Sequence, residues 1–277
     1  MEIPGNDDND NDREIGLICD FLNQQLGFTY NIHKKYLITT RLNKRLNKLG
    51  LHSYQSYLNL IKNDIRELNI FFDLLTTNVT SFFREDSQLQ ILRQELLPSL
   101  INVAAGANRL RCWSAGCSSG EEAYTLAIIL KETFGMDWDI KVLASDVSVK
   151  KLEEGMAGVY SAEKVQDIPA HLRYKYFSVM NTNKEFFKVK PQLRRAVVFR
   201  KININQDFEI PPHIQFDLIA CRNVFIYLAD EVRRRALAGF YHYLKDDGLL
   251  MVGQSEPINL TSSSQWGVLK SCIYQKK

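Results

Sequence analysis

Short apolar runs alternate with longer helical segments from about Asn108 onward, and this alternation constrains the fold more than any other feature. Residues 111–115 and 140–145 have the length and composition of buried strands, and residues 121–134 between them are long enough for a helix. Strands that alternate with helices in this way are typical of a parallel sheet with crossover helices. The sequence therefore predicts an α/β fold with a Rossmann-like sheet.

The rest of this sheet follows from similar patterns. Further strands are expected over residues 196–204, 216–221, 249–253 and 267–275, and a helix over residues 230–244. Asp247-Gly248 supplies the turn chemistry between that helix and the next strand. A polar stretch containing Tyr and Phe, at about residues 155–195, fits the main sheet poorly, so we expect it to form a small inserted subdomain.

The amino-terminal part has a different pattern. Apolar residues recur at every third or fourth position over residues 14–75, which predicts a small all-helical domain. Residues 1–13 are acidic and almost without aliphatic side chains, so we expect a disordered tail. The expected division is thus a tail over 1–13, a helical domain with a connector over 14–85, and the sheet domain over 86–277.

A basic stripe lies beside the apolar face of the second predicted helix. It consists of Arg41, Lys44, Arg45 and Lys48. By itself, such a stripe is typical of a solvated helix face.

Composition excludes several classes of protein. The net charge of +3 is small for 277 residues, which argues against nucleic-acid binding as the main activity. No apolar run approaches the ~20 residues of a membrane-spanning helix, so no membrane insertion is expected. The five cysteines form no CxxC pair and follow no secretory leader, which indicates free thiols, no zinc site and a cytoplasmic location.

The first predicted strand ends in a turn of small residues, 114–120, followed at once by Glu121 and Glu122. Such a turn lets the backbone pass close to a ligand at the carboxyl edge of the sheet. The turn lacks G-x-G-x-x-G, and acidic side chains stand where a pyrophosphate would bind, which disfavours a nicotinamide-dependent oxidoreductase.

Carboxylates at this helix start suit a positively charged ligand such as S-adenosylmethionine, and Asp146, at the end of the second strand, suits its ribose hydroxyls. The alternative is that both glutamates merely complement the helix dipole and that Asp146 caps a loop.

Ten residues decide between these readings. Residues 76–85 read TTNVTSFFRE, which closely resembles the signature of the chemotaxis receptor methyltransferases, the CheR family. The family's other motifs follow in order: residues 113–122 with Tyr124, then LASD at 143–146, CRNVFIY at 221–227, DG at 247–248 and GQSE at 253–256. The helical segment YLITTRL at 36–42 is also similar to the family's amino-terminal domain.

The resemblance implies specific roles. Asn78, Thr80 and Arg84 would reach into the cofactor pocket, Glu122 would hold the methionine amino group of S-adenosylmethionine, and Asp146 would bind its ribose. The remaining cofactor contacts would be Asn203, Ile204, Arg222 and Asn223. Arg84 would also orient the substrate, and Tyr227 would lie beside the transferred methyl group.

The implied reaction is methylation of glutamate side chains on the cytoplasmic helices of chemoreceptors, with S-adenosylhomocysteine as product and no metal. The basic stripe would then dock on the receptor's helical bundle. Residues 178–193 lack the glycine pair of relatives that grip a receptor tail pentapeptide, so we expect no such tethering. The alternative function is a catalytically silent S-adenosylmethionine-binding signalling adaptor, which the presence of Arg84 and Tyr227 disfavours.

Overall fold

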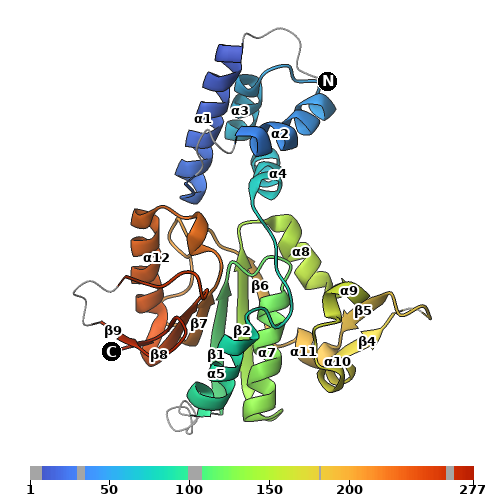
Figure 1. The fold of residues 1–277 in the computed structure, drawn as a ribbon, viewed down its shortest axis with the longest axis vertical. Coiled ribbons are helices and arrows are strands. Elements are labelled where there is room, and N and C mark those ends of the chain that lie inside the picture. Colours follow the sequence, from blue (N-terminus) through green and yellow to red (C-terminus); the bar gives the residue numbers. More distant parts are fainter. Residues whose placement is uncertain (1–7, 30–34, 99–107, 181, 260–264) are drawn as a thin grey trace. The chain divides into compact units, whose positions relative to one another are not determined.

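The structure is a computed structural model that describes residues 8–29, 35–98, 108–180, 182–259 and 265–277 (Figure 1). The chain divides into two compact units. The first comprises Met1–Thr77 with Tyr227–Arg235, and the second comprises Asn78–Ile226 with Ala236–Lys277. Among the described residues, no helix combines the length and apolarity that crossing a membrane requires.

The first unit contains α1 (Asp8–Leu26), α2 (Lys35–Leu49), α3 (Tyr54–Asn63) and α4 (Ile65–Leu75). The predicted apolar periodicity is confirmed, because Ile18, Leu42 and Leu46 are fully buried. Asp64 separates α3 from α4, since its carboxylate accepts hydrogen bonds from the backbone of Arg66 and Glu67 and so caps α4.

The expected tail over residues 1–13 needs correction. Helix α1 begins at Asp8, so residues 8–13 are helical, while residues 1–7 lie outside the described residues. Asp8, Asp10 and Asp12, three of the acidic residues that suggested disorder, stand in the first turns of this helix, where negative charge is favoured by the helix dipole.

The basic stripe on α2 is divided by its contacts. The Arg45 guanidinium donates to both carboxylate oxygens of Glu67, at 2.8 and 2.5 Å, and Arg41 donates to the carbonyl of Leu74 at 2.9 Å. Lys44 and Lys48 are exposed. Two of the four members therefore bind within the helical unit, and the docking role of the stripe stays a prediction.

The second unit contains a seven-stranded sheet in the order β6-β2-β1-β7-β8-β10-β9. The strands are β1 (Arg109–Ala115), β2 (Asp139–Asp146), β6 (Val197–Lys201), β7 (Phe216–Cys221), β8 (Leu244–Val252), β9 (Trp266–Val268) and β10 (Ile273–Lys276). The first five are parallel, whereas β10 pairs antiparallel with both β8 and β9. The predicted Rossmann-like sheet is confirmed.

Helices α7 (Glu121–Phe134) and α8 (Val149–Ala157) pack on this sheet, α7 against β1 and β2 and α8 against β2 and β6. Before β1 the chain forms α5 (Asp86–Ile91) and a π-helical turn (Leu92–Leu96). After β7 come a 3₁₀ turn (Phe225–Tyr227) and α12 (Asp230–Tyr243), whose first residues belong to the first unit. The predicted bounds of α7 and β7 agree with the structure.

The inserted subdomain is confirmed as a separate small sheet. Its strands β3 (Val159–Ser161), β4 (Phe177–Val179) and β5 (Phe186–Val189) are antiparallel in the order β3-β5-β4. Three short helices accompany them, α9 (Ala162–Val165), α10 (Ala170–Tyr176) and α11 (Pro191–Arg194).

Two details of the predicted sheet are wrong. The single closing strand over residues 267–275 is two antiparallel strands, because Ser271 and Cys272 have positive φ and reverse the chain. Asp247-Gly248 does not precede a strand but lies within β8, where the register with β7 shifts between the pairs Phe216–Leu244 and Leu218–Leu249. Asp247 has φ of 62°, as expected of a residue in an irregular ladder.

We predict that Glu67→Ala lowers the free energy of unfolding of the helical unit by about 3 kcal/mol, because it leaves the largely buried guanidinium of Arg45 without its carboxylate. Tyr57, which donates to the same carboxylate at 2.9 Å, also loses its partner. Urea denaturation followed by far-ultraviolet circular dichroism measures the change. Lys44→Ala, on the exposed side of α2, is the control and should change the unfolding free energy by less than about 0.5 kcal/mol.

The stabilisation by Glu67 should also depend on pH. The hydrogen bond from Arg45 lowers the pKa of Glu67 below its ordinary value of 4.5 against the opposing effect of burial. The stabilisation is therefore fully present above pH 4.5 and is lost as the pH falls through the lower folded pKa. A constant difference between wild type and Glu67→Ala across this acidic range would contradict the assignment.

Candidate functional site

The site is built on the turn between β1 and α7. The backbone amides of Gly116 and Cys117 donate to the carbonyl of Ser145 on β2, at 2.8 and 2.9 Å, which holds the turn against the end of that strand. Gly116 has φ of 85°, and a Cβ atom there would lie 2.5 Å from the side chain of Val224, which follows β7. A residue with a side chain would be strained here and would meet Val224, so glycine allows the turn to pack closely against the segment after β7.

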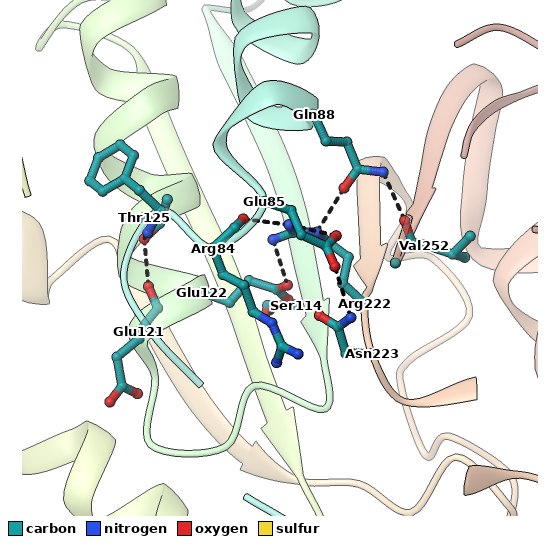
Figure 2. Close-up of polar contacts among 12 residues, drawn as sticks. Arg84, Glu85, Gln88, Ser114, Glu121, Glu122, Thr125, Arg222, Asn223 and Val252 are labelled. Atoms are coloured by element: carbon teal, nitrogen blue, oxygen red, sulfur yellow. Dashed lines mark hydrogen bonds and ion pairs between the residues drawn. The ribbon is translucent and has the colours of Figure 1, made fainter. Parts of the chain in front are cut away.

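Glu121 and Glu122, the two acidic residues after this turn, point in different directions (Figure 2). The Glu121 side chain is fully buried and accepts hydrogen bonds from Lys164 of α9 at 2.5 Å and from Ser119 at 2.8 Å. Its carboxylate therefore joins the turn to the inserted subdomain, and the expectation that Glu121 binds the cofactor stays a prediction.

Glu122 has the environment expected of a ligand-binding carboxylate. It accepts a hydrogen bond from Ser114 at 2.6 Å and lies 3.3 Å from the Arg222 guanidinium. Burial raises the pKa of Glu122, and the positive charge of Arg222 opposes that rise. The carboxylate is thus partly desolvated but retains a counter-ion, which suits a second cation such as an ammonium group.

The connector, residues 78–85, lies along this turn and α7. The hydroxyl of Ser118 donates to the carbonyl of Asn78 at 3.3 Å, and the amide of Phe83 donates to the hydroxyl of Thr125 at 3.2 Å. The Arg84 guanidinium donates to the carbonyl of Val79 at 2.9 Å and points away from Glu85 (Figure 2). Thr80, like Asn78, is half-buried in this segment.

Arg222 was predicted to contact the cofactor, but its donors are occupied within the protein. The side chain is 2% exposed and donates to Gln88 at 2.8 Å, to the Arg84 carbonyl at 2.5 Å and to Glu85 at 3.1 Å, in addition to Glu122. Arg222 thus connects the connector, α5 and α7 (Figure 2), and its contact with the cofactor stays a prediction.

Asn223 belongs to the same network. Its side-chain amide donates to Glu85 at 2.9 Å, and its backbone amide donates to Glu256 at 2.6 Å. Glu256 also accepts from the backbone of Gly253 and Ile226, so the segment that follows β7 is fixed to the segment that follows β8.

Sequence reasoning assigned no role to Glu85, Glu256 or Gln88. Glu85 and Glu256 lie within the motifs TTNVTSFFRE and GQSE, and this is the only sequence feature that could have pointed to them. Gln88 gave no signal, because its partners are distant in sequence.

Asp146, at the end of β2, lies beside the same turn. Its carboxylate accepts hydrogen bonds from the backbone amides of Ser118 at 2.8 Å and Ser148 at 2.9 Å. Asp146 thus stands at the carboxyl end of β2, the position where an acidic residue binds ribose hydroxyls in open α/β sheets. Asn203 and Ile204 lie just beyond β6, the neighbour of β2, with one residue between, and both are half-buried.

Tyr227 belongs to the first unit. Its carbonyl accepts a hydrogen bond from the amide of Thr29 at 2.9 Å, and its ring lies 6.1 Å from that of Phe28. Its role beside the transferred methyl group stays a prediction.

The described residues fit S-adenosylmethionine. Gly116 permits close approach of the backbone, Glu122 offers a partly desolvated carboxylate for an ammonium group, and Asp146 offers acceptors for ribose hydroxyls. These groups lie at the carboxyl ends of adjacent parallel strands, where open α/β sheets bind their ligands.

Comparison with known proteins gives two family matches that cover most of the chain. The model described as "CheR methyltransferase, SAM binding domain" matches residues 78–274, and the one described as "CheR methyltransferase, all-alpha domain" matches residues 13–76.

Curated relatives agree with these matches. The chemotaxis protein methyltransferase of Borreliella burgdorferi is 34% identical over 252 residues, which cover 88% of each chain. That of Escherichia coli is 32% identical over 252 residues, covering 88% of this chain and 84% of the relative.

Among solved structures, the glycopeptide N-methyltransferase MtfA complexed with sinefungin is 8% identical, covers 64% of this chain and 52% of its own, and has a TM-score of 0.35. We rest the assignment on the sequence matches, which span both units. The chain therefore belongs to the CheR methyltransferase family and is an S-adenosylmethionine-dependent methyltransferase.

Proposed function

We propose that this protein transfers the methyl group of S-adenosylmethionine to glutamate carboxylates on the cytoplasmic methylation helices of bacterial chemoreceptors. The products are a glutamate methyl ester and S-adenosylhomocysteine. The names of the relatives support a role in chemotaxis. The observation that carries the proposal is the placement of Glu122 and the Arg84 segment around one turn at the sheet edge.

The reaction depends on positioning the glutamate carboxylate and the methyl group more than on transferring a proton. S-adenosylmethionine supplies an electrophilic methyl group when bound. A glutamate side chain, with an ordinary pKa of about 4.3, is already a carboxylate at neutral pH, so no general base is required. Ordering the acceptor oxygen against the methyl group can contribute several kcal/mol to lowering the barrier. The protein's residues therefore need to fix two partners and exclude water.

Arg84 is the residue that we assign to orienting the substrate carboxylate. Its guanidinium makes one hydrogen bond within the connector, to Val79, and an arginine side chain has five N–H donors. The remaining donors suit a carboxylate, which accepts charge-assisted bonds from a guanidinium. We assign Tyr227 to packing beside the sulfonium, as the family motif implies.

The cofactor is assigned to groups on both sides of the turn. Glu122 would pair with its ammonium group, and Asp146 would accept from its ribose hydroxyls. The proposal also includes Asn78 and Thr80 of the connector, together with Asn203, Ile204 and Asn223 at neighbouring strand ends. The charged groups of Glu121 and Arg222 are paired within the protein, so we assign these two side chains to holding the site together, and their contact with the cofactor stays a prediction.

We predict that Glu122→Gln raises the Kd for S-adenosylhomocysteine by about tenfold or more, because the ammonium group loses its counter-charge. Glu121→Gln is the matched control, since it makes the same chemical change one residue earlier. It should alter that Kd by less than about threefold, although it weakens the contact with Lys164. Isothermal calorimetry measures both, and equal effects of the two substitutions would reject the assignment.

The function itself is tested by incubating the protein with chemoreceptor cytoplasmic fragments and tritiated S-adenosylmethionine, followed by mass spectrometry of the modified residues. We expect base-labile label on glutamate side chains. Arg84→Ala should lower the transfer rate about a hundredfold while S-adenosylhomocysteine still binds. Arg93→Ala, on the exposed side of the π-helical turn, is the control. Binding of the cofactor without any labelled glutamate would instead indicate a silent adaptor.

We assign receptor docking to the exposed part of the α2 stripe, Lys44 and Lys48. Their charge suits acidic receptor helices, and association between charged surfaces weakens as salt screens them. Lys44→Glu and Lys48→Glu should each raise the KM for the receptor fragment severalfold and leave the Kd for S-adenosylhomocysteine unchanged. Lys150→Glu, an exposed lysine of α8, is the control. A KM that does not respond to these two changes would place docking elsewhere.

A further inference from the structure

The Arg222 guanidinium joins three parts of the second unit that carry the site. One nitrogen donates to the Arg84 carbonyl in the connector, another lies against Glu122 at the start of α7, and Nε donates to Gln88 in α5. We propose that Arg222 is a positioning residue that holds the Arg84 backbone at a fixed separation from the Glu122 carboxylate. This inference rests on the proposed function, which assigns Arg84 to the substrate and Glu122 to the cofactor.

The occupancy of the guanidinium supports this role over cofactor binding. An arginine has five N–H donors in a planar fork, and the four contacts of Arg222 use most of them. Two of its acceptors, Glu85 and Glu122, are carboxylates. The charge of Arg222 is therefore already balanced, and a ligand carboxylate would find neither free charge nor a free pair of donors.

The backbone on both sides of Arg84 has an unfavourable conformation that other residues need to stabilise. Phe83 and Glu85, on either side of it, have φ of 52° and 55°, in the left-handed region that is costly for residues other than glycine. Such a conformation persists only where its surroundings fix it. Glu85 is fixed by Arg222, by the Asn223 side chain at 2.9 Å and by the Gln254 amide at 3.2 Å.

The network is anchored to the sheet on its other side. Gln88 is fully buried, and its side-chain nitrogen donates to the carbonyl of Val252, the last residue of β8, at 2.8 Å and to that of Ser271 at 2.5 Å. These bonds orient its amide so that its oxygen faces Arg222. Arg222 therefore links the connector, through Gln88, to the end of β8, and these bonds restrict movement of the connector.

A double-mutant cycle tests the proposal. Arg222→Lys keeps the charge but loses the fork. We expect its kcat for receptor methylation to fall about tenfold or more, while the Kd for S-adenosylhomocysteine changes by less than about threefold. Combined with Arg84→Ala, it should cause no further loss, because it acts through Arg84. Additive losses would show that Arg222 acts independently of Arg84, and a Kd raised in proportion to the loss in rate would show that Arg222 contacts the cofactor. Either result would overturn the proposal.

Amide hydrogen exchange gives a readout that does not depend on activity. In Arg222→Lys, exchange should accelerate at residues 82–86 and stay unchanged in the middle of α7. Unaltered exchange in the connector would overturn the proposal. If the wild-type protein methylates no receptor, the proposed function fails, and the exchange experiment still decides whether Arg222 holds the connector.

Glu85→Gln is a second variant in case Arg222→Lys does not fold, because it removes one charge and keeps the shape. It should lower kcat in the same direction, by about threefold to tenfold, and should be non-additive with Arg84→Ala. Lys270→Met breaks the exposed Lys270–Glu95 ion pair and is the matched control. It should change neither kcat nor exchange in the connector, and a loss equal to that of Glu85→Gln would reject a specific clamp.

Discussion

The buried guanidinium of Arg222 is the constraint on which the geometry of the site depends. A charged group with 2% exposure is tolerated only when its donors and its charge are satisfied, because desolvation of an ion costs several kcal/mol. Here its acceptors come from residues 84–88 and from residue 122, far apart in sequence from residue 222. The connector, the turn before α7 and the segment after β7 therefore have to assemble together or leave a charge unpaired.

The same turn is held from the other direction by the inserted subdomain. Lys164 pairs with Glu121, and the Tyr160 hydroxyl donates to the Ser119 carbonyl at 2.7 Å. Phe82 of the connector packs edge-on against Tyr160, with ring centroids 4.9 Å apart. Successive helix residues differ by about 100° in direction, so two adjacent glutamates serve two different neighbours. Glu121 joins the turn to the subdomain, and Glu122 contacts Ser114 and Arg222 instead.

Local signals were sufficient for much of this fold. β7 and α7 were predicted with the correct bounds, because a fully buried strand and a largely buried helix leave long apolar runs in the sequence. The helical start at Asp8, the divided closing strand and the role of Arg222 were not predicted. The first residue of a helix depends on several weak interactions. The closing strand is divided because two residues have positive φ. The partners of Arg222 include Gln88, which is 134 residues away in sequence. Periodicity and motifs contain no information on such pairings.

The two arginines of the site show how one side-chain type can serve opposite purposes. Arg222 is surrounded by acceptors, so its charge stabilises structure and is not available to a ligand. Within the described part of the chain, the Arg84 side chain donates one hydrogen bond, to the Val79 carbonyl, on the side away from Glu85. An arginine with free donors can bind a glutamate carboxylate strongly enough to orient it, yet over-tight binding of the ground state would slow methyl transfer. Because Arg222 is paired with Glu85 and Glu122, it can fix the position of the Arg84 backbone without binding the substrate carboxylate itself. Of these two arginines, the substrate then meets only Arg84 and is not bound too tightly.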